Sequence, residues 1–373
     1  MSVSARLRMF ATMAALTLLL ATSSLAQYKR TDLVTDKGVG GTLADGNLVN
    51  AWGLTALPTS PFWVSDNATG QSTLYTGGGG KIGLTVSIRA ANGGQGTPTG
   101  IVGNTTTSDF VVSEVVSENG KPSKVSGKAL FIFATLDGTI SGWSPVVAPP
   151  KDGISHATIA ADRSGAGASY TGLAIGSSNG KNFLFAADGG PNRRVDVFDS
   201  TFTPVDLGPG AFDDPGIPRN FTPYGIQVTT ATASDGTQTQ TVWVTYTALG
   251  KAQGGFVDSF TTAGVLIRHF AAHGPLHSPW GIAIAPADFG PMSNALLITN
   301  NISRGRVNAF DPGSGAFLGP LRDASGQPIE IDGLWGIQFG HDGGPNGAHN
   351  QLFFTAGSNS YGDGIFGVIT LDQ

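Results

Sequence analysis

Residues 278–321 read SPWGIAIAPADFGPMSNALLITNNISRGRVNAFDPGSGAFLGPL and contain four short apolar segments separated by turn-forming residues. The first segment, 280–285, alternates large and small side chains, which is the period of a β-strand. The second, 295–299, is almost wholly apolar, as in a strand that is covered on both faces. Asn, Gly and Pro-Gly turns precede the third and fourth segments, 306–310 and 316–321. The stretch therefore predicts a four-stranded sheet.

The opening Trp-Gly-Ile of this stretch recurs, with variation, along the whole chain. Its glycines are spaced 47 to 72 residues apart and are Gly53, Gly100, Gly172, Gly225, Gly281 and Gly336. Six four-stranded units at about this period indicate a β-propeller, in which each sheet covers its faces against two neighbours. Small residues on the innermost strand suit the crowded axis, where backbones approach closely. We predict an all-β fold, a six-bladed β-propeller.

The two ends of the chain are expected to meet in one blade. The last unit has predicted strands only at 335–339, 351–356 and 365–371, whereas residues 28–35 form a strand that precedes the first unit. We predict that this N-terminal strand completes the last blade, because closure removes two exposed sheet edges.

The other predicted strands follow the same repeat, and residues 108–126 form an insertion or an extended hairpin. We expect one domain over residues 27–373. The predicted strands are 52–57, 62–65, 72–76 and 84–88 in unit one; 129–135 and 139–144 in unit two; 171–176, 183–187 and 195–199 in unit three; and 224–229, 241–246, 255–260 and 265–270 in unit four.

The first 26 residues have the pattern of a secretory signal peptide. Arg6 and Arg8 precede an apolar segment, 9–21, and Ser24-Leu-Ala26 gives a small-residue cleavage site. A membrane anchor is the alternative, but the apolar segment is short for a bilayer. We expect a secreted or periplasmic protein that has no membrane span after cleavage near Ala26.

Charge and composition narrow the functional classes. Without Arg6 and Arg8, 19 of the 21 basic residues stand against 26 acidic ones, a net charge of −7. This charge argues against nucleic-acid binding through a basic surface. The chain has no cysteine, which excludes disulfides, thiolate nucleophiles and Cys-ligated metals. We expect a monomer whose partner is a small molecule, a glycan or a protein.

Several motifs resemble an uncharacterised family of exported bacterial proteins that is associated with the PEP-CTERM sorting system. These motifs cover nearly all of residues 27–373 and are 50–54 (NAWGL), 131–143 (FIFATLDGTISGW), 195–199 (VDVFD), 278–282 (SPWGI), 308–312 (NAFDP) and 332–336 (DGLWG). The resemblance implies an NHL-like six-bladed propeller and export, and it brings no established activity. Many members carry a C-terminal sorting tail, whereas this chain ends at Asp372-Gln373, which favours release or periplasmic residence.

Polar residues follow the second strands, where propeller ligands usually bind. Asp and Asn oxygens arranged around the axis would suit Ca²⁺, which prefers six to eight oxygen ligands. The alternative is that these residues serve only turn conformation and local hydrogen bonds. The residues at these turns are Asp66, Asn67, Asp137, Asp188, Asn300, Asn301, Ser358 and Asn359.

The residue before each repeated glycine is aromatic in four units, at Trp52, Tyr224, Trp280 and Trp335, and is threonine in units two and three. Units four, five, six and one are contiguous around the ring. One prediction is an aromatic arc that stacks on a sugar or another flat ligand. The other is packing between blades, because each aromatic shares its parity with the buried Ile or Leu that follows.

His269, His273 and His277 have helical spacing, but Gly274-Pro275 forbids a helix there. His277 alone, before an inner strand, is the better acid–base candidate, with Asp188 as a second. Two functions therefore stay open. One is a binding or scaffold protein of the cell envelope or exterior. The other is a calcium-dependent hydrolase, lactonase or lyase with its site at the top of the channel, since propellers host both kinds of function.

Overall fold

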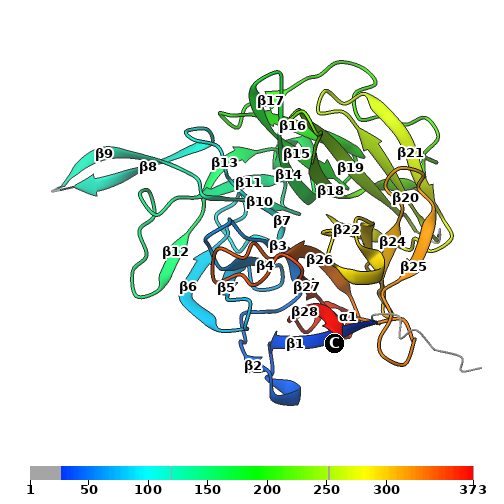
Figure 1. The fold of residues 1–373 in the computed structure, drawn as a ribbon. Coiled ribbons are helices and arrows are strands. Elements are labelled where there is room, and N and C mark those ends of the chain that lie inside the picture. The colour runs from blue at the N-terminus through cyan, green and yellow to red at the C-terminus, as the bar shows by residue number, and fades with distance from the viewer. Residues whose placement is uncertain (1–26, 119, 251–252, 373) are drawn as a thin grey trace, which may run out of the picture.

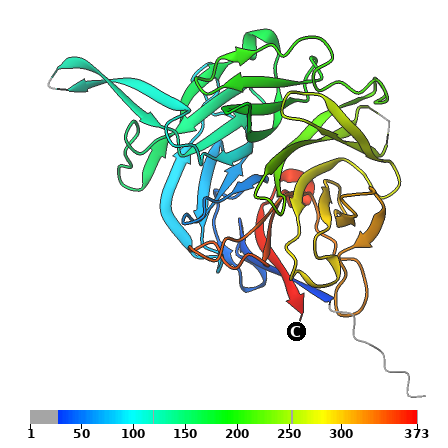
Figure 2. The same ribbon diagram turned by 45° about the horizontal axis from the view of Figure 1, so that its top comes forward.

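The computed structural model describes residues 27–118, 120–250 and 253–372 and shows six antiparallel sheets arranged around a central axis (Figures 1 and 2). The innermost strands follow one another around a closed ring. The all-β, six-bladed propeller predicted from the repeat is confirmed. The predicted signal peptide, residues 1–26, lies outside the described residues.

Each blade begins with the predicted inner strand, and most observed bounds lie within a few residues of the expected ones. Blade one consists of β3 (Ala51–Thr55), β4 (Phe62–Asp66), β5 (Gln71–Tyr75) and β6 (Lys81–Ser87). Blade two consists of β7 (Pro98–Gly103), β10 (Phe131–Thr135), β11 (Thr139–Trp143) and β13 (Thr158–Asp162). Blade three consists of β14 (Tyr170–Ser178), β15 (Lys181–Asp188), β16 (Arg194–Asp199) and β17 (Pro204–Val205).

The remaining blades follow the same order from the axis outwards. Blade four consists of β18 (Phe221–Thr232), β19 (Gln238–Ala248), β20 (Gly255–Phe260) and β21 (Leu266–Ala272). Blade five consists of β22 (Pro279–Ile284), β23 (Leu296–Asn300), β24 (Val307–Phe310) and β25 (Phe317–Pro320). Blade six consists of β26 (Leu334–Phe339), β27 (Leu352–Ala356), β28 (Ile365–Asp372) and β1 (Gln27–Thr35).

The N-terminal strand closes the ring, as predicted. β1 pairs antiparallel with β28 from Gln27 opposite Asp372 to Thr35 opposite Ile365. Figure 1 shows the blue β1 beside the red β28. The Tyr28 hydroxyl donates to the Phe289 carbonyl at 2.7 Å, so the strand also contacts blade five. Closure therefore depends on residues at opposite ends of the sequence.

Four features have no counterpart among the predicted strands. β13 and β17, the outer strands of blades two and three, were not predicted. β12 (Ile154–His156) adds a parallel fifth strand to blade one, and β2 (Leu43–Ala44) pairs with β1. By contrast, an extended hairpin was one of the two predictions for residues 108–126, and a hairpin is found: β8 (Val111–Glu118) with β9 (Lys121–Lys128) projects from the propeller (Figure 2). Strands of two or three residues, such as β2, β12 and β17, are too short to show an alternation of apolar and polar residues in the sequence.

Six apolar clusters lie between neighbouring blades and together form the core. Blades one and two, for example, bury Trp63 against Phe131, with ring centroids 4.1 Å apart. Every other pair of neighbours has a corresponding cluster. Each sheet is therefore buried on both faces, which is why the strand sequences contain nearly continuous apolar runs.

A threonine on the second strand joins neighbouring blades at the axis. The Thr299 hydroxyl accepts a hydrogen bond from the Gly281 amide at 2.7 Å and donates to the Trp335 carbonyl at 2.8 Å. Thr245 and Thr355 make the same two kinds of contact in blades four and six. Each hydroxyl thereby satisfies two backbone groups that belong to adjacent blades.

We expect Thr299→Val to lower the free energy of unfolding by about 1–3 kcal/mol, because it leaves two buried backbone groups unpaired at nearly constant volume. Urea denaturation measures this loss. Thr31→Val, at an exposed position of β1, is the matched control and should change stability little. Equal effects of the two variants would contradict the inter-blade role of Thr299.

Candidate functional site

Aromatic side chains from four inner strands meet on the propeller axis. Trp52 stacks on Trp335 with ring centroids 3.7 Å apart and an interplanar angle of 16°. Trp280 lies edge-on to Trp335 at 5.9 Å, and Tyr224 lies 5.7 Å from the same ring. Trp335 is the centre of the group and is only 1% exposed. We call these four residues and Tyr361, which is 5.6 Å from Trp335, the axial aromatic cluster.

Left-handed backbone conformations precede three of these aromatic residues. Asn50, Ser278 and Gly333 have φ angles of 49°, 47° and 63°. Each stands two positions before the tryptophan of its blade. Gly and Asn adopt this conformation most readily, whereas Ser adopts it at a cost. The same backbone turn therefore leads into Trp52, Trp280 and Trp335.

Tyr361 reaches the axis from the loop between β27 and β28. This loop holds the single turn α1 (Ser358–Tyr361), in which Asn359, Ser360 and Tyr361 all have positive φ. The Tyr361 hydroxyl donates to Asn301 Oδ1 at 2.8 Å, and the Tyr224 hydroxyl donates to the same oxygen at 3.3 Å. Burial raises the pKa of both phenols, so both stay protonated donors at neutral pH.

A chain of amide hydrogen bonds fixes the other side of the cluster. Trp335 Nε1 donates to Asn50 Oδ1 at 2.9 Å, and Asn50 Nδ2 donates to Asn67 Oδ1 at 3.0 Å. Asn67 Nδ2 in turn donates to the Pro98 carbonyl at 3.1 Å. This chain runs from blade six through blade one to blade two. The aromatic rings are thus held by hydrogen bonds as well as by packing.

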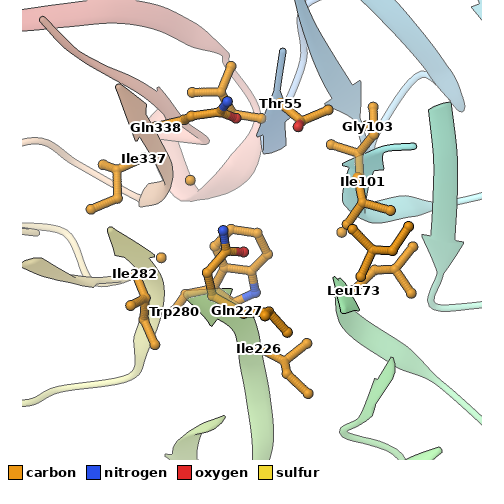
Figure 3. Close-up of a pocket in the computed structure, with 17 residues that line it drawn as sticks. Thr55, Ile101, Gly103, Leu173, Ile226, Gln227, Trp280, Ile282, Ile337 and Gln338 are labelled. Atoms are coloured by element: carbon orange, nitrogen blue, oxygen red, sulfur yellow. The ribbon is translucent and has the colours of Figure 1, made fainter. Parts of the chain in front are cut away.

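A channel continues along the axis beyond the aromatic cluster. It contains a cavity of about 220 Å³ lined by seventeen residues, with Trp280 at its inner end (Figure 3). The walls come from the aliphatic residue that follows each repeated glycine: Leu54, Ile101, Leu173, Ile226, Ile282 and Ile337. Thr55, Gln227 and Gln338 add polar groups, and none of the seventeen residues carries a formal charge.

Only one of the two glutamines has a free amide in the described part of the chain. Gln338 is held by the backbone, because its Oε1 accepts from the Ala56 amide and its Nε2 donates to the Ala56 carbonyl, each at 3.2 Å. Gln227 is exposed, and no hydrogen bond to its side chain occurs among the described residues. The channel therefore offers one adaptable polar side chain, beside aliphatic side chains that are largely buried between the blades.

The predicted calcium-binding residues lie in the second-strand turns and bond to nearby backbone or side chains. Asp188 accepts from the Ser169 and Gly190 amides and from Asn192 Nδ2 at 2.8 to 3.1 Å. Asp137 accepts from the Thr97 amide and hydroxyl at 2.7 and 2.8 Å. Asn300 joins the His277 amide to the Pro275 carbonyl. These contacts are the turn chemistry that was the alternative interpretation, and calcium binding stays a prediction.

The remaining candidates of that group are placed differently. The Asn67 side chain belongs to the amide chain described above. Asn359 is exposed, and its backbone amide donates to Asp332 Oδ2 at 2.8 Å. Asp66 is fully buried, and neither of its carboxylate oxygens has a hydrogen-bond partner among the described residues. Burial raises the pKa of Asp66 well above its usual value.

The two acid–base candidates come from different blades. His277 is exposed and lies before β22 in blade five, whereas Asp188 is buried at the end of β15 in blade three. No described contact joins their side chains, and Asp188 is engaged by its own turn. A joint catalytic role therefore has no geometric support in this structure. His269 lies within β21, in agreement with the strand predicted over 265–270.

Several residues of the axial site were not predicted from the sequence. Tyr361 belongs to a loop, and its position depends on how α1 turns back over the axis. Asn50 gave no signal beyond its place before Trp52. The aliphatic lining did leave a signal, since Leu or Ile follows all six repeated glycines. That pattern predicted inner strands, but it did not show that their side chains surround a channel.

Known proteins with similar sequences include uncharacterized proteins of a virus. An uncharacterized protein of Acanthamoeba polyphaga mimivirus is 28% identical over 361 residues, covering 94% of this chain and 87% of that protein. A second uncharacterized protein of the same virus is 28% identical over 360 residues, covering 94% and 82%. No family model matches the chain. The resemblance to a bacterial exported family gains no support from these relatives.

Similar solved structures are propellers of low sequence identity. A glucose dehydrogenase superposes with a TM-score of 0.52 at 12% identity, covering 92% of this chain and 99% of that one. A virginiamycin B lyase from Staphylococcus aureus gives a TM-score of 0.47 at 12% identity, covering 93% and 100%. The first likeness supports the fold. At such identity, neither activity carries over to this chain.

Proposed function

We propose that this protein is an exported binding protein that takes a small, neutral molecule with both apolar and polar groups into the central channel. The uncharged lining carries the proposal, because a charged ligand would lose its hydration there without gaining an opposite charge. The aliphatic side chains of the lining are largely buried between blades, so the channel presents polar as well as apolar surface to a ligand. Gln227 supplies the adaptable hydrogen-bonding group, and Trp280 supplies an aromatic surface at the inner end.

The axial aromatic cluster supports binding at the channel and not on the cluster itself. Trp52 and Trp335 are 6% and 1% exposed, so a sugar stacking on either ring would first have to displace its neighbours. Trp280 is part of the channel lining and is also fixed by its Nε1, which donates to the Thr171 carbonyl at 2.8 Å. A flat ligand in the channel would therefore meet a Trp280 ring whose position is already fixed.

Export is part of the proposal and depends on residues outside the described structure. Among residues 27–118, 120–250 and 253–372, no helix has the length and apolar character required to cross a bilayer. Mass spectrometry of protein recovered outside the cytoplasm tests the predicted cleavage near Ala26. A recovered chain that retains residues 1–26 would contradict it.

The channel is tested with the neutral fluorescent probe N-phenyl-1-naphthylamine. We expect saturable binding by the wild-type protein and at least about a tenfold weaker affinity for Gln227→Trp, whose larger side chain obstructs the channel. Gln327→Trp, in an exposed turn of another blade, is the matched control and should bind like the wild type.

Competition with a sugar in the same experiment tests the proposed class of ligand. Cellobiose, a neutral but strongly polar sugar, should not displace the probe. Displacement by cellobiose would replace the proposed class of ligand by a glycan, and unchanged probe binding in Gln227→Trp would remove the channel from the proposal.

The calcium-dependent hydrolase, lactonase or lyase stays a separate prediction. Calcium titration followed by thermal unfolding tests it, with Asp188→Asn and Asn300→Ala as variants. A rise in Tm with Ca²⁺ that both variants lose would support a cation at the second-strand turns. A calcium-independent Tm would contradict that site without affecting the channel.

A further inference from the structure

Three side chains with metal-binding atoms meet at one edge of blade four, away from the axis. They are Asp214, Asp258 and His269, and one potential ligand atom from each lies within 4.8 Å of the others. Asp258 and His269 are directly opposite each other on β20 and β21. Asp214 comes from the loop that joins blades three and four. The group therefore combines a sheet pair with a separate loop.

The loop that carries Asp214 is fixed on the blade by packing and hydrogen bonds. Phe212 packs on Phe260 with ring centroids 5.4 Å apart, and its amide donates to the Gly264 carbonyl at 2.8 Å. Asp214 Oδ1 accepts from the Gly216 amide at 2.7 Å, which leaves Oδ2 directed toward His269. The position of this carboxylate is thus set before any ligand binds.

The distances within the group leave one carboxylate without a hydrogen bond. His269 Nδ1 lies 2.9 Å from Asp214 Oδ2 and 2.9 Å from Asp258 Oδ1. One ring nitrogen carries at most one hydrogen, so His269 Nδ1 can donate to only one of the two carboxylates. The hydrogen-bond geometry is met with Asp214 Oδ2. Asp258 is 0% exposed, and neither of its oxygens has a hydrogen-bond partner among the described residues. A buried carboxylate in this state is costly unless a cation compensates it.

The groups around Asp258 offset its burial only in part. Burial and the neighbouring Asp214 carboxylate raise the pKa of Asp258 to about 7, while His269 and the Tyr246 hydroxyl act in the opposite direction. Burial, with Asp258 as a further cause, also raises the pKa of Tyr246 well above its usual value. Asp213, Arg193 and Arg219 line the adjoining cleft of about 230 Å³, together with Asp214 and Tyr246.

We propose that Asp214, Asp258 and His269 bind one divalent transition-metal ion of the Zn²⁺ class, with a fourth coordination position open to the cleft beside Tyr246. One imidazole nitrogen and two carboxylate oxygens form a donor set that Zn²⁺ accepts, whereas imidazole is not a ligand that Ca²⁺ prefers. Tetrahedral Zn²⁺ places its ligand atoms roughly 3.3 Å apart, so small outward movements from 2.9 Å would accommodate the ion.

Isothermal titration of the EDTA-treated, dialysed full-length protein with ZnCl₂ tests the site. We expect one ion per chain, and Asp258→Asn and His269→Gln should each weaken binding by about 100-fold or more. Co²⁺ provides a second measurement, because a tetrahedral site gives a visible absorption band that the same variants should lose. Asp214→Asn, in a loop, serves if the buried Asp258 variant does not fold by circular dichroism.

Two other histidines supply the controls. His273→Gln changes an exposed neighbour of the same region, and His349→Gln removes a histidine that contacts the exposed Asp288 and Asp342. Both variants should retain wild-type Zn²⁺ affinity. Loss of binding in His349→Gln with retention in His269→Gln would overturn the proposal, as would the absence of any Zn²⁺ binding. The latter result would mean that the three residues form only a proton-sharing ion cluster.

Discussion

Replacing Gly225 by alanine is expected to lower the free energy of unfolding by about 3–5 kcal/mol. A Cβ at Gly225 would lie 2.0 Å from the Trp280 carbonyl oxygen and 2.9 Å from the Thr245 hydroxyl. Trp280 is on the inner strand of blade five and Thr245 is on the second strand of blade four. The first neighbour is a backbone atom, and the second is fixed by hydrogen bonds. The methyl group can be accommodated only if blades four and five move apart.

A similar close approach occurs at three other repeated glycines, Gly53, Gly100 and Gly281. A Cβ at Gly53 would lie 2.2 Å from the Thr99 carbonyl, and one at Gly100 would lie 2.3 Å from the Leu173 amide nitrogen. The contact therefore belongs to the ring and not to one blade. Gly83→Ala in β6 is the matched control, because nothing lies within 4 Å of its Cβ position. Chemical denaturation of both variants measures the difference, and equal stabilities would contradict close packing at the axis.

Removal of the N-terminal strand is expected to abolish cooperative folding. A chain that begins at Lys37 lacks β1, so β28 becomes a free edge along its length. Two core clusters also lose a buried residue, since Tyr28 packs between blades five and six and Val34 between blades six and one. The combined loss of about 5 kcal/mol or more is comparable to the stability of a typical domain.

Complementation in trans separates loss of the strand from a general truncation effect. Thermal unfolding of chains that begin at Gln27 and at Lys37 gives the loss itself. A synthetic peptide of residues 27–36 should restore cooperative unfolding to the shorter chain, because β-strand addition supplies the missing hydrogen bonds and side chains. A scrambled peptide should not. Equal melting of the two chains without peptide would show that β1 does not stabilise the ring.

The course of the ring could be predicted because each blade repeats its own signals. The alternation in 280–285 and the glycine that follows each Trp, Tyr or Thr are local patterns, and they place every inner strand. Ring closure by residues 28–35 could also be predicted, because the last unit contains only three predicted strands. The outer strands were less predictable, since β12 and β17 have two or three residues and pair with segments that periodicity does not identify.

The candidate sites depend on contacts between blades, which no local pattern contains. The aromatic positions were identified in the sequence, but their meeting on the axis depends on how four inner strands are inclined. The channel lining and the free Gln227 amide likewise depend on the ring geometry. The turns after the second strands were found, whereas the use of Asp188 and Asn300 in those turns became visible only with their hydrogen bonds.

The amino-acid sequence by itself determined the number of blades, the positions of the six inner-strand glycines and the strand that seals the ring, because strand period and turn chemistry act over a few neighbouring residues. Tertiary structure alone decided that Asp214, Asp258 and His269 meet and that the channel lining is uncharged. These features require loops and strands from separate parts of the chain to converge. These loops and strands meet because whole sheets pack against one another, and the spacing of residues along the chain does not predict that packing.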